Sequence, residues 1–263
     1  MSCRLDIAVA GAGGVASSMA PALKEAGHSV RCVYSRTRES ACTLADAIGS
    51  EWTVSLESLP HGVQVCIVML RDDALKSLAP DIVKACGSDT LYLHTAGSVP
   101  MSLWQEAGAK HYGVLYPMQT FSRGKQVDWQ QVPVFVEASP GDLDTVRTLA
   151  ESISGHVQEL SSDDRCRLHI AAVFTCNFTN RMYAIAQRLL ERMDVPFSVM
   201  YPLLAETAAK AQKMNPAEGQ TGPAVRGDHS VMDHHLQMLA DTPEWAELYR
   251  LISKDIEDDR LRS

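Results

Sequence analysis

The chain has 263 residues, of which 46% are hydrophobic and 21% charged, and its formal net charge is -8 at pH 7. This composition predicts a folded protein with a substantial core, because disordered chains are poorer in apolar residues. The length suits one large domain or two modest ones. The negative charge argues against a general nucleic-acid partner, since proteins that bind nucleic acids are more often basic.

Cysteine usage and the N-terminus bear on the compartment. The seven cysteines form no C-x-x-C pair, which favours reduced thiols over a disulfide framework or a zinc site. They are Cys3, Cys32, Cys42, Cys66, Cys86, Cys166 and Cys176. The N-terminus lacks the apolar stretch of a signal peptide, and no segment approaches the ~20 apolar residues of a membrane span. We therefore expect a soluble, cytoplasmic protein with no membrane partner.

In the first half of the chain, short apolar runs alternate with segments of helical spacing. This alternation predicts a mainly parallel α/β sheet with right-handed crossovers. The expected strands span 5–10, 30–34, 63–70, 90–94, 112–116 and 132–137. The expected helices span 15–26, 39–48, 75–86 and 142–154, and the first three are followed at once by a glycine, a common helix terminator.

The second half is predicted to be all-α. Ser161 and Ser162 offer helix caps, and a helical pattern continues from there to about Met193. Its apolar stripe consists of Ile170, Phe174, Phe178, Met182, Ile185 and Leu189. Further helices are expected over 197–214, over 229–239 and from Thr242 to about Arg260, with a loop over 215–228 that is rich in glycine and proline.

A glycine motif follows the first strand. Gly11, Gly13 and Ala16 form G-x-G-x-x-A between a predicted strand and a predicted helix. In a Rossmann-type domain, the first glycine permits the tight turn, the second admits the pyrophosphate, and the third position packs the helix on the strand. Helix N–H groups then face the anion. We expect Gly11, Ala12, Gly13, Gly14 and Val15 to bind a dinucleotide; the alternative is a Rossmann-like fold that has lost its nucleotide.

The end of the second strand favours NADP(H) over NAD(H). An NAD site would place a carboxylate there, but this chain has Ser35, Arg36 and Thr37, and the next carboxylate is Glu39. Arg36 offers a planar positive charge for a 2′-phosphate, and the two hydroxyls offer donors. The alternative interpretation is a solvated basic turn.

Ligands of open parallel sheets bind at the carboxyl ends of the strands. We therefore expect cofactor contacts after the third and fourth strands, and substrate contacts after the fifth. The cofactor contacts are Met69, Leu70, His94 and Thr95, with Ser98 near the nicotinamide; the substrate contacts are Tyr116, Met118 and Gln119. An ordinary polar loop remains the alternative for either group.

The long helix would supply the opposite wall of the site. At ~100° per residue, His169, Val173, Cys176 and Asn180 share one line, and Asn177 lies on the same side. Polar groups on a helix suited to burial need partners, which can be a ligand or a core network.

Two further groups of polar residues, one around Arg226 and one of histidines, follow later in the chain. We expect Arg226 to contact substrate, whereas Asp228 also fits as a helix N-cap. The histidines at 229, 234 and 235 suggest a metal site, but adjacent positions of a helix cannot both face one ion, so none is predicted.

In these residues the chain resembles a family of NADP oxidoreductases that pair a Rossmann-like domain with a helical C-terminal domain of unknown function. The motifs that carry the resemblance are GAGGVA at 11–16, YSRT at 34–37, HTAGSVP at 94–100, YPMQTFS at 116–122, LHIAAVFTCNFTN at 168–180 and TGPAVRGD at 221–228. More distantly, the chain is similar to the 6-phosphogluconate dehydrogenase-like superfamily, which includes prephenate dehydrogenases and pyrroline-5-carboxylate reductases. It departs from that group at Tyr116, where prephenate dehydrogenases have histidine, and it lacks an evident catalytic lysine.

These inferences combine into one hypothesis. The chain is predicted to have a dinucleotide-binding Rossmann domain over 1–158 and a helical substrate and dimerisation domain over 159–263. We expect an NADP(H)-dependent oxidoreductase that acts on a small polar metabolite bound between the domains. In that hypothesis His169 is the acid or base or polarises the substrate, Asn177 is the orienting residue and Ser98 lies near the nicotinamide. The alternative is a non-catalytic NADP(H)-binding sensor, which an apolar plug facing the nicotinamide would favour. A homodimer through the helical domain is expected, because a small helical unit buries apolar surface poorly.

Overall fold

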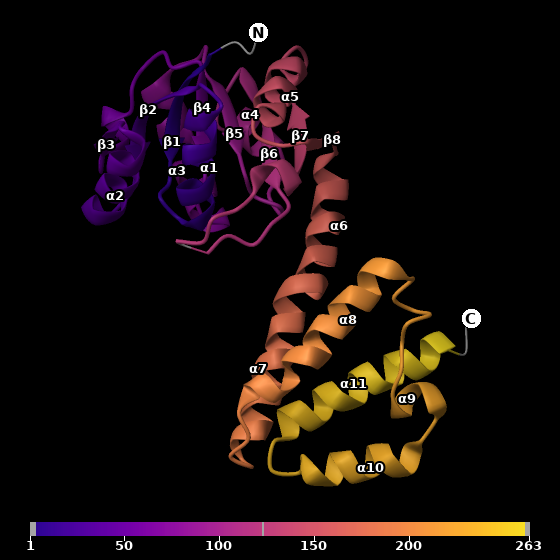
Figure 1. Ribbon diagram of the computed structural model, residues 1–263. Helices are drawn as coiled ribbons and strands as arrows, with labels where there is room; N and C mark the ends of the chain where they lie inside the picture. Colours follow the sequence, from indigo (N-terminus) through magenta and orange to yellow (C-terminus); the bar gives the residue numbers. More distant parts are fainter. Residues whose placement is uncertain (1–3, 123, 261–263) are drawn as a thin grey trace. The chain divides into compact units, whose positions relative to one another are not determined.

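The structure is a computed structural model that describes residues 4–122 and 124–260. Cys3 therefore lies outside the described residues, and the other cysteines are free thiols. The chain divides into two compact units between Asn177 and Phe178 (Figure 1). The predicted domain boundary at 158/159 falls inside the last strand of the sheet.

The first unit is built on an eight-stranded sheet with the order β3-β2-β1-β4-β5-β6-β7-β8 (Figure 1). The strands are β1 (Asp6–Ala10), β2 (Ser29–Tyr34), β3 (Glu51–Thr53), β4 (Val65–Val68), β5 (Leu91–His94), β6 (His111–Pro117), β7 (Pro133–Ala138) and β8 (His156–Glu159). Neighbouring strands are parallel except for β6 and β7. Among its described residues, the connection between β6 and β7 contains only the 3-10 turn η2 (Trp129–Gln131). Parallel strands are usually joined by a crossover helix, and these residues include none, in line with the antiparallel pairing. The predicted mainly parallel α/β sheet is confirmed.

Helices cover both faces of this sheet because the side chains of its central strands alternate. Ile7 and Val9 of β1 enter one hydrophobic core, whereas Ala8 and Ala10 enter the other. The first core is closed by α1 (Gly14–Glu25), α2 (Arg38–Ile48) and α5 (Leu143–Glu151). The second is closed by η1 (Leu56–Ser58), α3 (Asp72–Cys86) and α4 (Ser102–Glu106).

The sequence prediction missed the short strands β3 and β8, the short helix α4 and the 3-10 turns η1 and η2. β3 and β8 are the edge strands, and most of their side chains are partly or fully exposed, so neither forms an apolar run. The helix α4 spans a single turn and buries only Trp104. Elements this short leave no periodicity to detect.

The remaining elements are helical, as predicted. Ser161 caps α6 (Ser162–Ala172) by accepting a hydrogen bond from the Asp164 amide, and the π-helical segment η3 (Val173–Phe178) and α7 (Thr179–Glu191) follow. The elements after them are η4 (Phe197–Met200), α8 (Tyr201–Lys213), α9 (Pro223–Arg226), α10 (His229–Met238) and α11 (Pro243–Arg260). The short helix α9 lies inside the predicted loop over 215–228, where it begins at a proline.

The predicted apolar stripe of the long helix is only partly covered. Ile170, Phe174 and Phe178 are 58%, 63% and 49% exposed, whereas Met182, Ile185 and Leu189 line a cavity of the second unit. Helical spacing reveals which residues share a face, but burial of that face requires an opposing surface. None of the described helices has both the length and the apolar character needed to cross a membrane.

Candidate functional site

The first unit gathers its candidate site at one edge of the sheet. Strands β1, β4, β5 and β6 are mutually parallel, so their carboxyl ends meet at the same edge. The loops that begin with Gly11, Met69, Thr95 and Met118 all leave from these ends. This is the edge where ligands of open α/β sheets bind.

The glycine motif forms the turn that the sequence predicts. Gly11 adopts a φ of +126°, and its amide donates to the Tyr34 carbonyl oxygen at 2.8 Å. A Cβ at this position would collide with the backbone of Met69. Ala16 is fully buried where α1 packs on the sheet. The first and third positions of the motif are therefore fixed by the fold itself.

Gly13 is different, because the fold does not need a glycine there. It is the N-cap of α1 with extended backbone, and a Cβ built on it would meet nothing within 4 Å. Within the described part of the chain no side chain caps this helix, and its first turn carries no acidic residue. The first amides of a helix have no partner within it and carry a partial positive charge. The open space beside them fits a pyrophosphate, with Ala12, Gly14 and Val15 around it.

The turn after β2 presents exposed cationic and hydroxyl groups. Arg36 and Thr37 are exposed and Ser35 is half-buried, and Arg36 makes no ion pair within the described part of the chain. The guanidinium of Arg38, in contrast, lies 5.3 Å from the centre of the Trp52 ring. A free guanidinium beside two hydroxyls fits a phosphate monoester such as the 2′-phosphate of NADP(H).

The loop after β6 also approaches the glycine turn. A Cβ on Gly14 would lie 2.5 Å from the carbonyl oxygen of Phe121, so this backbone lies against the start of α1. The Phe121 ring stacks on Trp129, with centroids 5.4 Å apart, and the Trp129 indole donates to the Ser18 carbonyl at 3.1 Å. The loop that carries the predicted substrate residues therefore borders the phosphate turn.

A tyrosine and a histidine meet at the end of β6. The Tyr116 hydroxyl lies 3.1 Å from Nδ1 of His169, and the two rings are edge to face with centroids 6.2 Å apart. Burial raises the pKa of Tyr116, and the charge of Arg165 partly opposes that rise. The phenol therefore stays protonated near neutral pH, and it can accept from Nδ1 in one tautomer of the imidazole or donate to Nδ1 in the other.

These two side chains line a cavity of about 530 Å³ within the first unit. Its lining combines apolar groups with hydrogen-bonding groups: Tyr116, Met118, Gln119, Thr120, Leu168, His169, Ala171, Ala172, Thr175, Cys176 and Asn177. No lysine, arginine, aspartate or glutamate is among these described residues. The structure thus brings together five predicted catalytic or substrate residues, from the end of β6 and from α6 and η3.

The predicted helical line through the site needs correction. His169, Cys176 and Asn177 line the cavity, but Val173 does not. Val173 lies one regular turn after His169, and residues four apart share a helix face only approximately. From Val173 to Phe178 the chain forms a π-helix, whose wider turns shift the side chains that follow Val173 around the axis. Asn180 belongs to the second unit, as does Arg226 at the end of α9. Their predicted contact with substrate stays a prediction.

His94 is not the exposed group that its place at a strand end suggested. Its side chain is fully buried, its Nδ1 accepts from the Ala96 amide at 3.2 Å, and its ring packs 6.2 Å from that of Trp104. Burial and the nearby charge of Arg165 lower the pKa of His94 to about 3. The imidazole is a neutral core group, so only the backbone of His94 could contact a cofactor.

Ser98 is also placed differently from the prediction. Its hydroxyl is exposed and donates to the Asp72 carboxylate at the start of α3, and it does not line the cavity that contains His169. Thr95, Met69 and Leu70 follow their strands at the ligand-binding edge, where Met69 is buried and the other two are half-buried. Ser98 is therefore separated from the proposed acid or base, although it remains in a loop at this edge.

Two residues that the sequence analysis overlooked support this site. Arg165 is 1% exposed, and its Nη1 donates to the Glu137 carboxylate at 2.7 Å. Gly97 is buried against the imidazole of His169. The sequence could have pointed to Arg165, because it lies one turn before His169 and residues four apart share a helix face.

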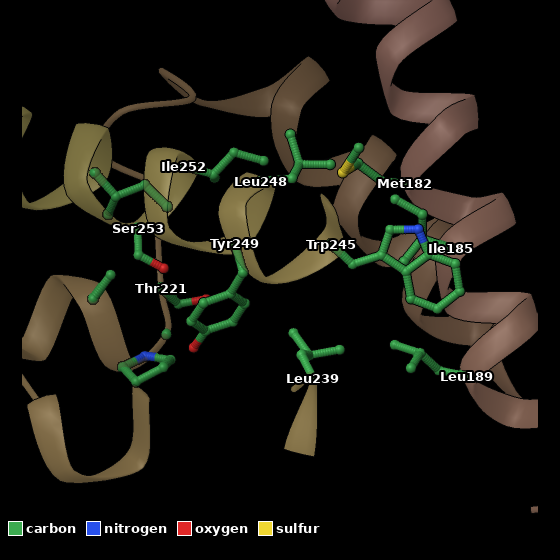
Figure 2. Close-up of a pocket in the computed structure, with 14 residues that line it drawn as sticks. Met182, Ile185, Leu189, Thr221, Leu239, Trp245, Leu248, Tyr249, Ile252 and Ser253 are labelled. Carbon is green, nitrogen blue, oxygen red and sulfur yellow. The ribbon is translucent and has the colours of Figure 1, made fainter. Parts of the chain in front are cut away.

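The second unit contains a separate cavity of about 300 Å³. Figure 2 shows apolar side chains of α7 and α11 around it, with Leu239, Thr221 and Ser253 also labelled. The Tyr249 hydroxyl, one of few polar groups there, bonds Nδ1 of His235 at 2.9 Å. This cavity offers hydrophobic contact but no free acid or base.

Two of the three histidines that suggested a metal site, His229 and His235, contact other side chains, and the neighbouring Asp228 is a helix cap. Asp228 caps α10 by accepting from the Val231 amide at 3.3 Å. His229 lies 3.6 Å from the Glu257 carboxylate. No cluster of three or more histidine, cysteine, aspartate or glutamate side chains suited to a metal ion occurs among the described residues.

Comparison with known families gives two matches along the chain. A model described as NADP oxidoreductase, coenzyme F420-dependent, matches residues 6–92. A domain of unknown function, DUF2520, matches residues 132–256. No curated protein matches the chain.

Solved structures match nearly the whole chain. A "putative NADP oxidoreductase" from Bacteroides fragilis is 44% identical with a TM-score of 0.91, and the match covers 97% of this chain and 98% of that one. A reductive aminase from Aspergillus terreus, in complex with NADPH and ethyl levulinate, is 15% identical with a TM-score of 0.72, covering 98% and 95%. A pyrroline-5-carboxylate reductase from Coxiella burnetii is 13% identical with a TM-score of 0.60, covering 99% and 98%. The last two similarities show a shared fold.

Proposed function

Because the chain belongs to the family of NADP oxidoreductases that combine a coenzyme F420-dependent NADP oxidoreductase domain with a DUF2520 domain, we propose that it transfers a hydride to or from a small polar metabolite bound beside His169. NADP(H) is the cofactor of this family, and the bound nicotinamide would supply or accept the hydride. The residues around Gly13 would hold the pyrophosphate, and Ser35, Arg36 and Thr37 would hold the 2′-phosphate.

The His169–Tyr116 pair is the observation that supports a catalytic role. In the direction of reduction, a protonated His169 would give its Nε2 proton to the oxygen or nitrogen that receives charge on the substrate, and the ring would become neutral. The Tyr116 hydroxyl oxygen, 3.1 Å from Nδ1, can accept from the Nδ1–H that the ring keeps in both states. In the direction of oxidation, Nε2 of the neutral imidazole would accept the proton instead. An imidazole suits both directions, since the same ring nitrogen can give or take a proton.

The lining of the cavity indicates the kind of group that would react there. Its polar members are hydrogen-bond donors and acceptors, including Gln119, Thr175 and Asn177. A carbonyl, imine or hydroxyl group would find hydrogen-bonding partners among them, and Asn177 is well suited to orient it. The contribution predicted for Asn180 and Arg226, and hence a site between the two domains, stays a prediction.

The alternative, a non-catalytic NADP(H) sensor, predicts an apolar plug where the substrate would bind. The cavity beside His169 is open and lined by polar as well as apolar groups, which favours the enzyme.

The test is a screen of keto acids, imines and hydroxy acids with NADPH or NADP⁺, followed by variants. On a substrate that turns over, His169→Asn should lower kcat by ~10²–10⁴, the usual contribution of a general acid or base, while NADPH affinity is unchanged. His156→Asn, which alters an exposed histidine of the same unit, is the control. Normal turnover by His169→Asn would disprove the catalytic assignment. NADPH binding without turnover of any compound would favour the sensor.

A further inference from the structure

The imidazole of His169 packs directly on a glycine. A Cβ at Gly97 would lie 2.6 Å from Nδ1 and 2.8 Å from Cγ of His169, distances that real Cβ contacts essentially never show. The backbone of Gly97 does not itself demand glycine, since its φ lies outside the left-handed region. The absence of a side chain at residue 97 is therefore explained by the imidazole that occupies the space.

The helix that carries His169 is fastened to the loop that carries Gly97. Arg165 lies one turn before His169 on α6, and its Nη2 donates to the carbonyl oxygen of Val99 at 2.5 Å. Val99 is two residues beyond Gly97 in the loop after β5. One guanidinium thus sets the separation of the two surfaces that meet at the imidazole.

The same guanidinium is anchored to the sheet. Its Nη1 donates at 2.7 Å to Glu137 of β7, and this carboxylate also accepts from the amide and hydroxyl of Ser162 at 3.0 and 2.6 Å. The Ser162 hydroxyl in turn accepts from the Met101 amide at 2.9 Å. Burying such a pair carries a large desolvation cost, so its benefit to stability is small and a role in fixing geometry is the better explanation.

We propose that Gly97 and the buried Arg165–Glu137 ion pair are positioning residues, which keep His169 within hydrogen-bond distance of Tyr116 and so orient the imidazole for proton exchange with the substrate. None of the three touches the substrate in this scheme, because Arg165 is almost fully enclosed and Gly97 has no side chain. The proposal rests on the proposed role of His169 in catalysis. The electrostatic influence of Arg165 on Tyr116 is consistent with it, since that charge lies close enough to lower the phenol pKa.

The decisive variant is Gly97→Ala, because its backbone is compatible with alanine and the new methyl group must displace the imidazole. We expect turnover to fall about 10- to 100-fold, as misplacement of a catalytic group by about 1 Å can cause. The melting temperature and NADPH affinity should change little. Gly219→Ala is the matched control, because a Cβ there meets its nearest atoms at ordinary contact distances of 3.5 Å or more.

Two further measurements separate positioning from general damage. In a double-mutant cycle, Gly97→Ala should lower turnover in the wild-type background but not in His169→Asn, because no imidazole remains to displace. Without any substrate, the His169 ring resonances in a ¹³C-labelled histidine NMR spectrum, assigned by their loss in His169→Asn, should shift in Gly97→Ala and in Arg165→Lys but not in Gly219→Ala. Arg165→Lys keeps the charge and loses the planar fork that bonds both Glu137 and Val99.

The outcomes distinguish a failure of the positioning role from a failure of the catalytic role of His169. Unchanged His169 resonances in a folded Gly97→Ala protein would overturn the positioning role. So would additive losses of turnover in the double mutant. If His169→Asn turns over normally, the catalytic assignment fails first, whatever the resonances show.

Discussion

Acidification should destabilise this protein through His94. The side chain is fully buried, and burial together with the charge of Arg165 lowers its pKa to about 3. In the unfolded chain the same imidazole titrates near pH 6.5. Below that pH the unfolded state therefore binds a proton that the folded state refuses, so the free energy of unfolding falls as the pH falls.

The size of the effect follows from the two pKa values. The loss begins near pH 6.5, approaches about 1.4 kcal/mol per pH unit, and ends near the folded-state value of about 3. Between pH 7.5 and pH 5.0 it amounts to about 2 kcal/mol, a large share of the stability of a typical domain. Above pH 7.5 His94 is neutral in both states and contributes nothing to the pH dependence.

Urea unfolding at a series of pH values would measure this effect, with His94→Asn as the comparison. Asparagine does not titrate, and its side-chain oxygen can replace Nδ1 as the acceptor for the Ala96 amide. The variant should be less stable at every pH, because asparagine fills less of the buried space than histidine does. Its free energy of unfolding should nevertheless depend less on pH. His28, whose pKa is also lowered by burial, remains in both proteins and cancels from the difference.

His156→Asn serves as the control, since this side chain is exposed. The reasoning would be refuted if wild type and His94→Asn lost the same free energy, within about 0.5 kcal/mol, between pH 7.5 and 5.0. That result would mean that His94 is hydrated or protonated in the folded state.

Three other expectations concern the cofactor and the assembly. Gly13→Val should remain folded, because a Cβ there meets nothing within 4 Å, yet lose dinucleotide binding; unchanged NADPH affinity in calorimetry would show that the pyrophosphate lies elsewhere. Wild type should bind NADPH at least about tenfold more tightly than NADH, about 1.4 kcal/mol, and Arg36→Ala should remove most of that preference. Arg38→Ala is the comparison for that variant, since its guanidinium packs on Trp52; equal wild-type affinities for the two cofactors would contradict the expectation. Finally, we propose a homodimer through the helical domain, where Met193, Leu203 and Leu251 are each at least 58% exposed; a monomer mass in light scattering at micromolar concentration would rule it out.

Much of the first unit could be predicted, because its strands, helices and glycine turn depend on residues that are close together in the sequence. The buried strands are continuous apolar runs, the helices between them show one apolar face, and glycine follows three of them. Gly11 adopts the backbone conformation that its position in the motif predicts, and Arg36 is exposed in the turn after β2. Each of these properties depends on a residue and its sequence neighbours, so a single sequence contains it.

The catalytic candidates depended on the tertiary structure instead. Nothing local relates Tyr116 to His169, which lie 53 positions apart and meet only because β6 ends where α6 passes. The same topology buried His94 beside Trp104, and the cavity beside His169 is lined by Cys176 and Asn177 but not by Val173. Periodicity assigns a side chain to a face of its own element, whereas the packing of separate elements decides what that face meets.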